Sequence, residues 1–195
     1  MSIVRWFRKR QHAINTCAGK EDFVGLFESE RVTLKRLALL LTANSHLANQ
    51  CLVLALRDCI EQSSVAKGWV LTWTRRVVIR NAISLVMGYG GQPLMETTHD
   101  AEKDMVVFSA EESPAPIADD QPILDLPKFD RFVFVICILE RCSLNDCALL
   151  LGSSPRDVFE ACKRTESRLE RIGDAGDGSL QAAMLSFAAR MEGAQ

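Results

Sequence analysis

The sequence has few of the residues that enzymes most often use for acid–base or metal chemistry. It contains only three histidines, and these lie far apart at His12, His46 and His99. It also has no glycine-rich phosphate-binding loop and no recognised nucleophile motif. We therefore predict that the protein is not an enzyme, with no catalytic residues and no cofactor.

Closely spaced metal-binding pairs are missing as well. The seven cysteines include no Cys-x-x-Cys pair, and no histidine lies near a cluster of them. Zinc sites need closely spaced thiolates or imidazoles, so no metal site is predicted. Most of the cysteines occupy apolar positions of expected helices, where a free thiol behaves as a small hydrophobic group. We expect reduced cysteines packed in the core.

The chain also lacks an apolar run long enough to span a membrane. The longest run, Phe132–Leu139, is much shorter than the roughly 20 residues that a spanning helix needs. The charged N-terminus is not followed by the apolar stretch and cleavage site of an export signal. These absences predict a cytoplasmic protein that does not insert into a membrane.

Charge is distributed unevenly, although the net charge is only −2. Residues 1–19 are basic and contain no acid, whereas the stretch from Glu96 to Asp130 has ten acidic residues and two lysines. The segment 88–122 also holds several prolines and few apolar side chains. Such a composition buries too little apolar surface to offset the entropy of ordering, so we expect a flexible acidic linker there.

Helical periodicity dominates elsewhere, and strand patterns are nearly absent. Apolar residues recur at three- and four-residue steps from Phe23 to Leu41. The run Leu47–Leu56 is apolar around most of its circumference, which predicts a buried helix, and Trp69–Val86 predicts another long helix. The chain is therefore predicted to be all-α, with two small helical domains joined by the acidic linker. The expected parts are a basic arm at 1–19, a helical domain at 20–87, the linker at 88–122, a helix-turn-helix domain at 123–172, and a glycine-rich break with a short amphipathic helix at 173–195.

The C-terminal domain has boundary signals for three helices. Pro127 opens the first, which is expected to run to about Arg141. Ser143 caps the second, and Gly152 ends it, because glycine readily adopts the left-handed conformation found at helix ends. Ser154 caps the third. Two short helices joined by a glycine-containing turn predict a helix-turn-helix.

The third helix combines an apolar stripe with a polar face. The expected buried stripe is Val158, Cys162, Thr165 and Leu169, and the predicted DNA-binding residues are Arg156, Asp157, Glu160, Lys163, Arg164 and Arg168. Arg156 and Glu160 are expected to read base edges, and the three cations that follow them to contact phosphates. Acidic residues nearly balance the basic ones along this helix, which would weaken DNA binding. The alternative is therefore an ordinary pair of amphipathic helices.

A longer pattern runs through the same domain. Its main positions are Leu126, Pro127, Arg131, Glu140, Ala148, Gly152, Val158, Arg164 and Leu169. This pattern resembles region 4 of bacterial sigma factors, most closely those of the extracytoplasmic-function type. The resemblance implies a domain that reads the −35 promoter element and binds the polymerase flap, preceded by a region 2 helical domain and a linker. The implied partners are promoter DNA, the RNA polymerase core and an anti-sigma factor.

The N-terminal domain carries a second candidate DNA-binding face. Trp69, Trp73, Arg76 and Arg80 follow one another at steps of four, three and four, on one face of a helix, with Asn81 beside them. Aromatic rings and guanidinium groups form a stacking platform for unpaired bases, worth about 1–3 kcal/mol per base. The alternative is that both tryptophans pack against neighbouring helices. The Arg-Asn pair resembles that of the sigma region 2 helix that opens the −10 element.

The sequence departs from the sigma pattern at several positions. Arg141 and Cys142 replace a Gly-Leu pair before the second helix of the C-terminal domain. Asp157 replaces a threonine, and Ala161 an often basic residue. The run Ala48–Leu56 lacks the acidic residues that the family uses to engage the polymerase clamp.

Three functional hypotheses follow from these patterns. The first is a sigma-factor-like DNA-binding transcription initiation factor that recruits RNA polymerase to promoters. The second is a degenerate sigma-like adaptor, which binds polymerase or an anti-sigma factor without recognising promoters. The third is an ordinary helix-turn-helix repressor, which would bind palindromic DNA as a dimer.

Overall fold

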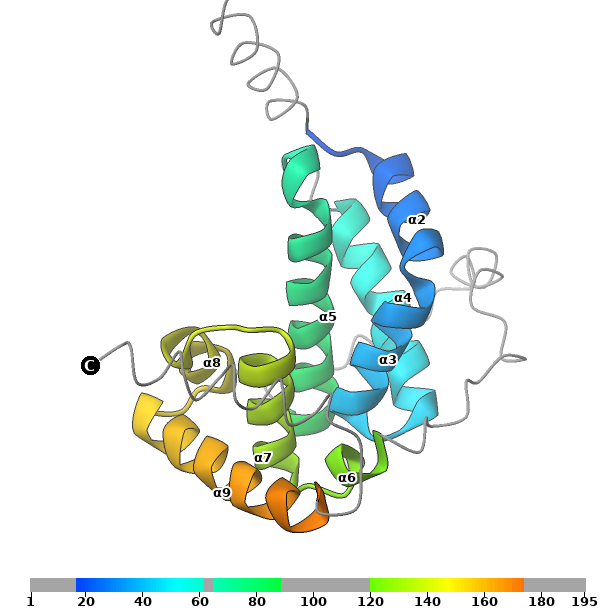
Figure 1. Cartoon of the computed structure of the whole chain (residues 1–195). Helices are drawn as coiled ribbons and strands as arrows, with labels where there is room; N and C mark the ends of the chain where they lie inside the picture. Colours follow the sequence, from blue (N-terminus) through cyan, green and yellow to red (C-terminus); the bar gives the residue numbers. More distant parts are fainter. Residues whose placement is uncertain (1–16, 62–64, 89–119, 174–195) are drawn as a thin grey trace, which may run out of the picture. The chain divides into compact units, whose positions relative to one another are not determined.

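A computed structural model describes residues 17–61, 65–88 and 120–173, with side chains described through Leu169 (Figure 1). These residues form helices and one isolated β-bridge, between Cys17 and Ala66, but no β-strand. They belong to two compact units, which divide between Glu111 and Glu112. The prediction of an all-α protein is confirmed. Most of the predicted basic arm and linker, and the C-terminal amphipathic helix, lie outside the described residues.

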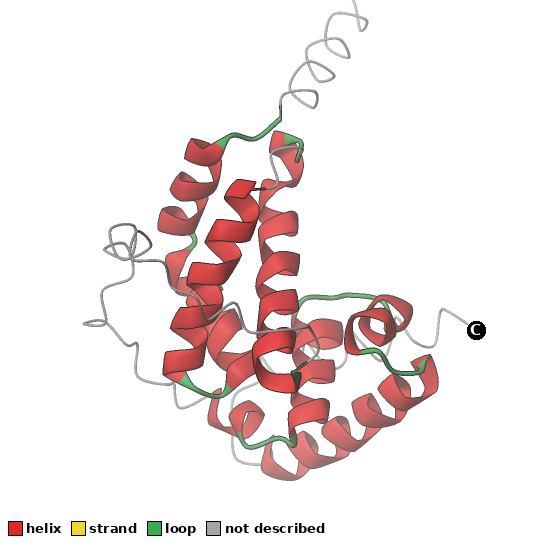
Figure 2. Ribbon diagram, turned by 180° about the vertical axis from the view of Figure 1, so that it is seen from behind, coloured by secondary structure: helices red, strands yellow, loops and turns green. Residues whose placement is uncertain are grey.

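The first unit is a bundle of helices that lie within the range predicted for the first helical domain (Figure 2). Its elements are α2 (Lys20–Ser29), α3 (Arg31–Thr42), α4 (Ser45–Glu61), the 3-10 turn η1 (Lys67–Trp69) and α5 (Val70–Met87). The helices α3, α4 and α5 all contact one another, and α2 packs on all three. The C-cap residues that follow α3 and α5, Ala43 and Gly88, are both in the left-handed conformation (φ of 51° and 70°).

Apolar side chains from all four α-helices form the core of the first unit. The largest of them, all fully buried, are Phe23 and Phe27 of α2, Leu34 and Leu41 of α3, Leu52 of α4, and Val78 and Ile79 of α5. Helix α4 differs from the expectation of a helix buried on most sides. Its buried residues, Ala48, Cys51, Leu52, Ala55 and Cys59, follow one face, whereas Val53 is 36% exposed. One face is buried because α2, α3 and α5 all pack against α4.

The second unit contains α6 (Gln121–Leu124), α7 (Lys128–Val133), the π-helical turn η4 (Phe134–Leu139), α8 (Leu144–Leu151) and α9 (Pro155–Gly173). Helix α6 begins two residues before the expected domain start. Helix α9 packs on α7, η4 and α8. Among the described helices of both units, none combines the length and the apolar character needed to cross a membrane.

The first helix of this unit changes its winding halfway along. Pro127 is the N-cap of α7, and the helix continues directly into η4, where the Glu140 N–H donates to the carbonyl of Val135 at 2.9 Å. The seven consecutive residues from Phe132 to Ile138 are all buried. The helix ends at Leu139, slightly earlier than predicted, and Arg141 follows in the left-handed conformation (φ 56°). All residues of the wider π-turn except the last, Leu139, are thus buried.

The predicted caps and turn of the helix-turn-helix are confirmed. The Ser143 hydroxyl accepts a hydrogen bond from the Asp146 N–H at 3.0 Å, and the Ser154 hydroxyl accepts one from the Asp157 N–H at 3.1 Å. Gly152 stands between α8 and α9 with a φ of 59°, a conformation that costs glycine little. The predicted stripe of α9 is buried along its whole length. From Ser143 to Leu169, the backbone therefore has the caps, the turn and the buried stripe that the sequence predicts.

The cysteines are free thiols, and most are buried. Cys51, Cys59, Cys137, Cys147 and Cys162 lie in the two cores, whereas Cys142 is half-buried and Cys17 is exposed. In the second unit, Cys137 hydrogen-bonds with both Cys147 and Cys162, and these contacts together with burial raise the pKa of the latter two thiols. In the first unit, burial raises the pKa of Cys51 to about 12 and that of Cys59 to about 11. These four thiols are therefore protonated near neutral pH.

These positions predict which thiols react in the folded protein. At mildly alkaline pH, an aromatic disulfide reagent should modify Cys17 fastest and Cys142 more slowly. The five buried thiols should remain unmodified, because they are inaccessible and the thiolate is the reacting form. Release of the chromophore before and after addition of denaturant, with peptide mapping, measures this. Rapid labelling of Cys147 or Cys162 in the folded protein would contradict it.

The two adjacent serines before α9 give a matched stability test. Ser154→Ala removes the N-cap and should lower the free energy of unfolding by about 1 kcal/mol. Ser153→Ala should be neutral or stabilising, because the buried Ser153 hydroxyl has no hydrogen-bond partner among the described residues. Urea unfolding followed by circular dichroism measures both. Equal losses in the two variants would show that the cap contributes nothing specific.

Candidate nucleic-acid interface

The polar face of α9 is the strongest candidate for contact with nucleic acid. Arg156, Glu160 and Lys163 are exposed, on the side of the helix opposite the buried stripe. Arg156 stands in the first turn, next to the α8–α9 turn. The N-terminal residues of a recognition helix are those that reach base edges in the major groove. The structure therefore leaves Arg156 and Glu160 accessible for the role that the sequence predicts.

Asp157 has a structural role in this turn. Its carboxylate accepts hydrogen bonds from the Ser154 hydroxyl at 2.7 Å and from the Ser154 N–H at 3.4 Å. These bonds hold the pKa of Asp157 below its ordinary value, so the ionised form is favoured in the folded chain. The resulting stabilisation is present above the ordinary pKa and is lost as the pH falls through the lowered one. Asp157 thus fixes the start of α9.

Lys163 lies over the ring of a neighbouring aromatic residue. Its ammonium nitrogen is 4.6 Å from the centre of the Phe159 ring. A cation at this distance is attracted to the ring face, which restricts the flexible lysine side chain. Phe159 thereby holds one positive charge close to the surface of α9.

Arg164 forms an ion pair with Asp130 of α7. One guanidinium nitrogen (Nη2) donates to Asp130 Oδ1 at 2.7 Å, and Nε donates to Oδ2 at 3.4 Å. The Asp130 side chain is only 10% exposed and that of Arg164 is 55% exposed. The hydrogen bonds from Arg164 to Asp130 are the main cause that raises the pKa of Arg164. Arg164, which the sequence predicts to contact a phosphate, is therefore paired with a carboxylate of the protein itself.

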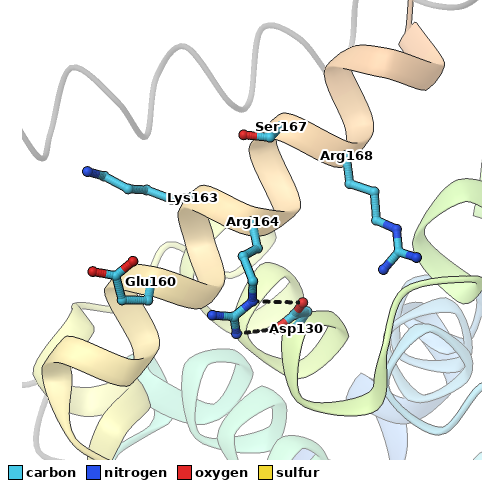
Figure 3. Close-up of a pocket in the computed structure, with 6 residues that line it drawn as sticks. All are labelled: Asp130, Glu160, Lys163, Arg164, Ser167 and Arg168. Atoms are coloured by element: carbon cyan, nitrogen blue, oxygen red, sulfur yellow. Dashed lines mark hydrogen bonds and ion pairs between the residues drawn. The ribbon is translucent and has the colours of Figure 1, made fainter.

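The ion pair belongs to a surface pocket with a polar lining. Six residues line it: Asp130, Glu160, Lys163, Arg164, Ser167 and Arg168 (Figure 3). Figure 3 shows Arg164 pointing toward Asp130, whereas Lys163 extends away from that pair. Three cations and two carboxylates give the lining a formal charge of +1. This face is only weakly positive.

The candidate face of the first unit is only partly exposed. Trp69 lies in η1, and its side chain is 63% exposed. Trp73 is half-buried, and its indole N–H is buried without a hydrogen-bond partner among the described residues. Arg76 is exposed. Trp69 is thus available for stacking, whereas Trp73 packs at least in part against its own unit.

The Arg-Asn pair of this face is held by a single carboxylate. The Nη2 group of Arg80 donates to Asp58 Oδ2 at 3.2 Å, and the Asn81 amide donates to the same oxygen at 2.9 Å. The Asn81 amide also donates to the carbonyl of Val77 at 3.1 Å. Asp58 lies on α4 and its side chain is 22% exposed. Two of the five predicted residues therefore engage one acid of a neighbouring helix.

Neither Asp58 nor Asp130 was among the residues expected at a functional site. Each is an acidic residue with apolar residues close to it in the sequence, in the segments Leu54–Ile60 and Phe129–Val133. An isolated carboxylate in such a helix is the available signal, because a buried charge needs a partner. The sequence does not indicate which cation is that partner.

Stability measurements on the two tryptophans show which ring packs against its own unit and which is left available for stacking. Trp69→Ala should change the free energy of unfolding by less than about 0.5 kcal/mol, because the side chain is largely exposed. Trp73→Ala should cost roughly 1–3 kcal/mol, below the range for a fully buried aromatic residue. Denaturant unfolding followed by circular dichroism measures both. A large loss for Trp69→Ala would show that this ring is a packing residue.

The described ranges contain no group of side chains suited to bind a metal ion. Comparisons with known proteins do not place the chain in a family. Among residues 17–61, 65–88 and 120–173, no three His, Cys, Asp or Glu side chains are grouped so as to hold a metal ion. Comparison of the chain with models of protein families, with curated proteins and with solved structures gives no match.

Proposed function

We propose that the protein is a sigma-factor-like DNA-binding transcription initiation factor that recruits RNA polymerase to promoters. The observation that carries the proposal is the α8–Gly152–α9 helix-turn-helix, with a buried stripe on one side of α9 and exposed polar residues on the other. Two capped helices at such a turn are the usual means of presenting a helix to the major groove.

The residues of α9 divide into two roles in this proposal. Arg156 and Glu160, in the first turns, read base edges. Lys163 and Arg168 contact phosphates, because both are exposed and carry charges that phosphate oxygens attract. Arg164 is engaged with Asp130 and supports the helix.

The weak positive charge of the polar face of α9 implies that the protein needs a partner to bind DNA tightly. Non-specific affinity depends on how many phosphates a protein neutralises, and the pocket on α9 has a formal charge of only +1. The second unit alone should therefore bind duplex DNA weakly. Polymerase core, the partner that the sigma resemblance implies, would hold the helix on the promoter.

A second candidate function is an adaptor that binds a protein and does not read promoters. The observation in its favour is Leu149 of α8, whose side chain is 81% exposed beside the helix-turn-helix. The absence of acidic residues from Ala48 to Leu56 points the same way. An anti-sigma factor or polymerase itself would be the partner in that case.

Transcription with purified core polymerase on a promoter library tests the proposal. The wild-type protein should produce core-dependent RNA from a subset of promoters. Lys163→Gln with Arg168→Gln should reduce that RNA, and should make the salt dependence of log K for DNA less steep by about 1.8. Lys128→Gln with Arg141→Gln removes the same charge from residues outside α9 and should leave both readouts near those of the wild type.

The same experiment distinguishes the adaptor. Absence of core-dependent RNA from every promoter would contradict the sigma-like function. Stable binding to core polymerase that is unaffected by Arg156→Ala would then favour the adaptor.

A further inference from the structure

We propose that Asp130 and Asp58 limit the affinity of the protein for DNA, each by holding one arginine of a candidate DNA face in an electrically neutral pair. This inference rests on the proposed function, because it concerns how the same two faces meet phosphates. It assigns a role to two carboxylates that touch no base and no phosphate themselves.

The first step is the strength of the Arg164–Asp130 pair. Two guanidinium nitrogens point at the two carboxylate oxygens, the geometry in which arginine binds carboxylates best. The Asp130 side chain is 10% exposed, so water screens its negative charge poorly. The attraction is therefore stronger than that of an ion pair on the open surface.

The second step is competition with phosphate. If Arg164 left Asp130 for a DNA phosphate, the carboxylate would remain nearly buried without its counter-charge. A buried charge that loses its partner is strongly destabilising. Arg164 therefore stays with Asp130 when DNA approaches, and a phosphate meets a pair of zero net charge.

The third step is the charge of the surroundings. The lining of the pocket on α9 includes three cations, Lys163, Arg164 and Arg168, and two carboxylates, Asp130 and Glu160, which leaves a formal charge of +1. Replacement of Asp130 by asparagine would raise this to +2. The amide oxygen of asparagine can still accept a hydrogen bond from Arg164, so the side chain would keep its place.

The first unit repeats the arrangement with different residues. Asp58 of α4 accepts hydrogen bonds from Arg80 and Asn81 of α5, and its side chain is 22% exposed. In both units the arginine is one that the sequence predicts to contact DNA, and in both the carboxylate comes from a neighbouring helix. The two pairs are independent, since each lies within its own unit.

The consequence is a protein that binds DNA weakly without a partner. Each pair removes about one effective charge from a face that would otherwise attract phosphates. Low non-specific affinity keeps a promoter-reading protein from being held by random DNA, and leaves recruitment to its partner.

The test uses the full-length protein and fluorescence anisotropy with labelled duplex DNA of random sequence, without polymerase. Asp130→Asn should make the salt dependence of log K steeper by about 0.9, which corresponds to roughly 8-fold tighter binding at about 0.1 M salt. Asp125→Asn is the matched control, because it removes the same charge from an exposed residue of the same unit. It should change the slope much less.

A double variant identifies the arginine that carries the effect. The gain of Asp130→Asn should disappear when Arg164→Gln is added. Asp58→Asn, tested with labelled single-stranded DNA, should also tighten binding, and this variant keeps the proposal testable if Asp130→Asn fails to fold.

The outcomes separate this inference from the proposed function. If the wild type binds DNA and neither Asp130→Asn nor Asp58→Asn, shown to be folded by circular dichroism, binds it more tightly, the inference is overturned and the proposed function stands. If none of the proteins binds DNA in the presence or absence of core polymerase, both are overturned.

Discussion

The second unit depends on the left-handed turn at Gly152. The φ of 59° at this residue ends α8 and lets the chain reverse into α9 within a few residues. Ser143 and Ser154 cap the two helices on either side, which satisfies backbone N–H groups that a helix start leaves unpaired. Because α9 begins at a fixed point, its stripe from Val158 to Leu169 packs on α7, η4 and α8, and the opposite face stays in solvent.

That solvent face is polar without being strongly positive. Asp157 is used in the cap, Arg164 is paired with Asp130, and Glu160 offsets one of the remaining cations. In the first unit, the charge of Arg80 is likewise neutralised by an ion pair with Asp58. Both candidate faces therefore present arginines whose orientation is fixed by an acid of a neighbouring helix, a property that separates them from an open basic surface.

Local signals in the sequence predicted the helix-turn-helix in detail, because caps and helix ends depend on residues within a few positions of one another. The predictions at Ser143, Gly152 and Ser154 are of this kind. The π-turn from Phe134 to Leu139 was not predicted, since its apolar residues would suit an α-helix equally well. Helix α4 was predicted to be buried on most sides. An apolar sequence shows that a helix can be buried, but its packing partners decide which face is.

The sequence by itself determined the all-helical class, the caps at Ser143 and Ser154, the turn at Gly152, and most of the thiols and apolar residues of the core. These follow from periodicity, capping and hydrophobicity, which act over short distances along the chain. Only the tertiary structure decided that Asp130 meets Arg164, 34 positions away, and that Asp58 meets Arg80, 22 positions away. The physical reason is that an ion pair depends on distance in space, and spacing along the chain does not reveal which helices pack side by side.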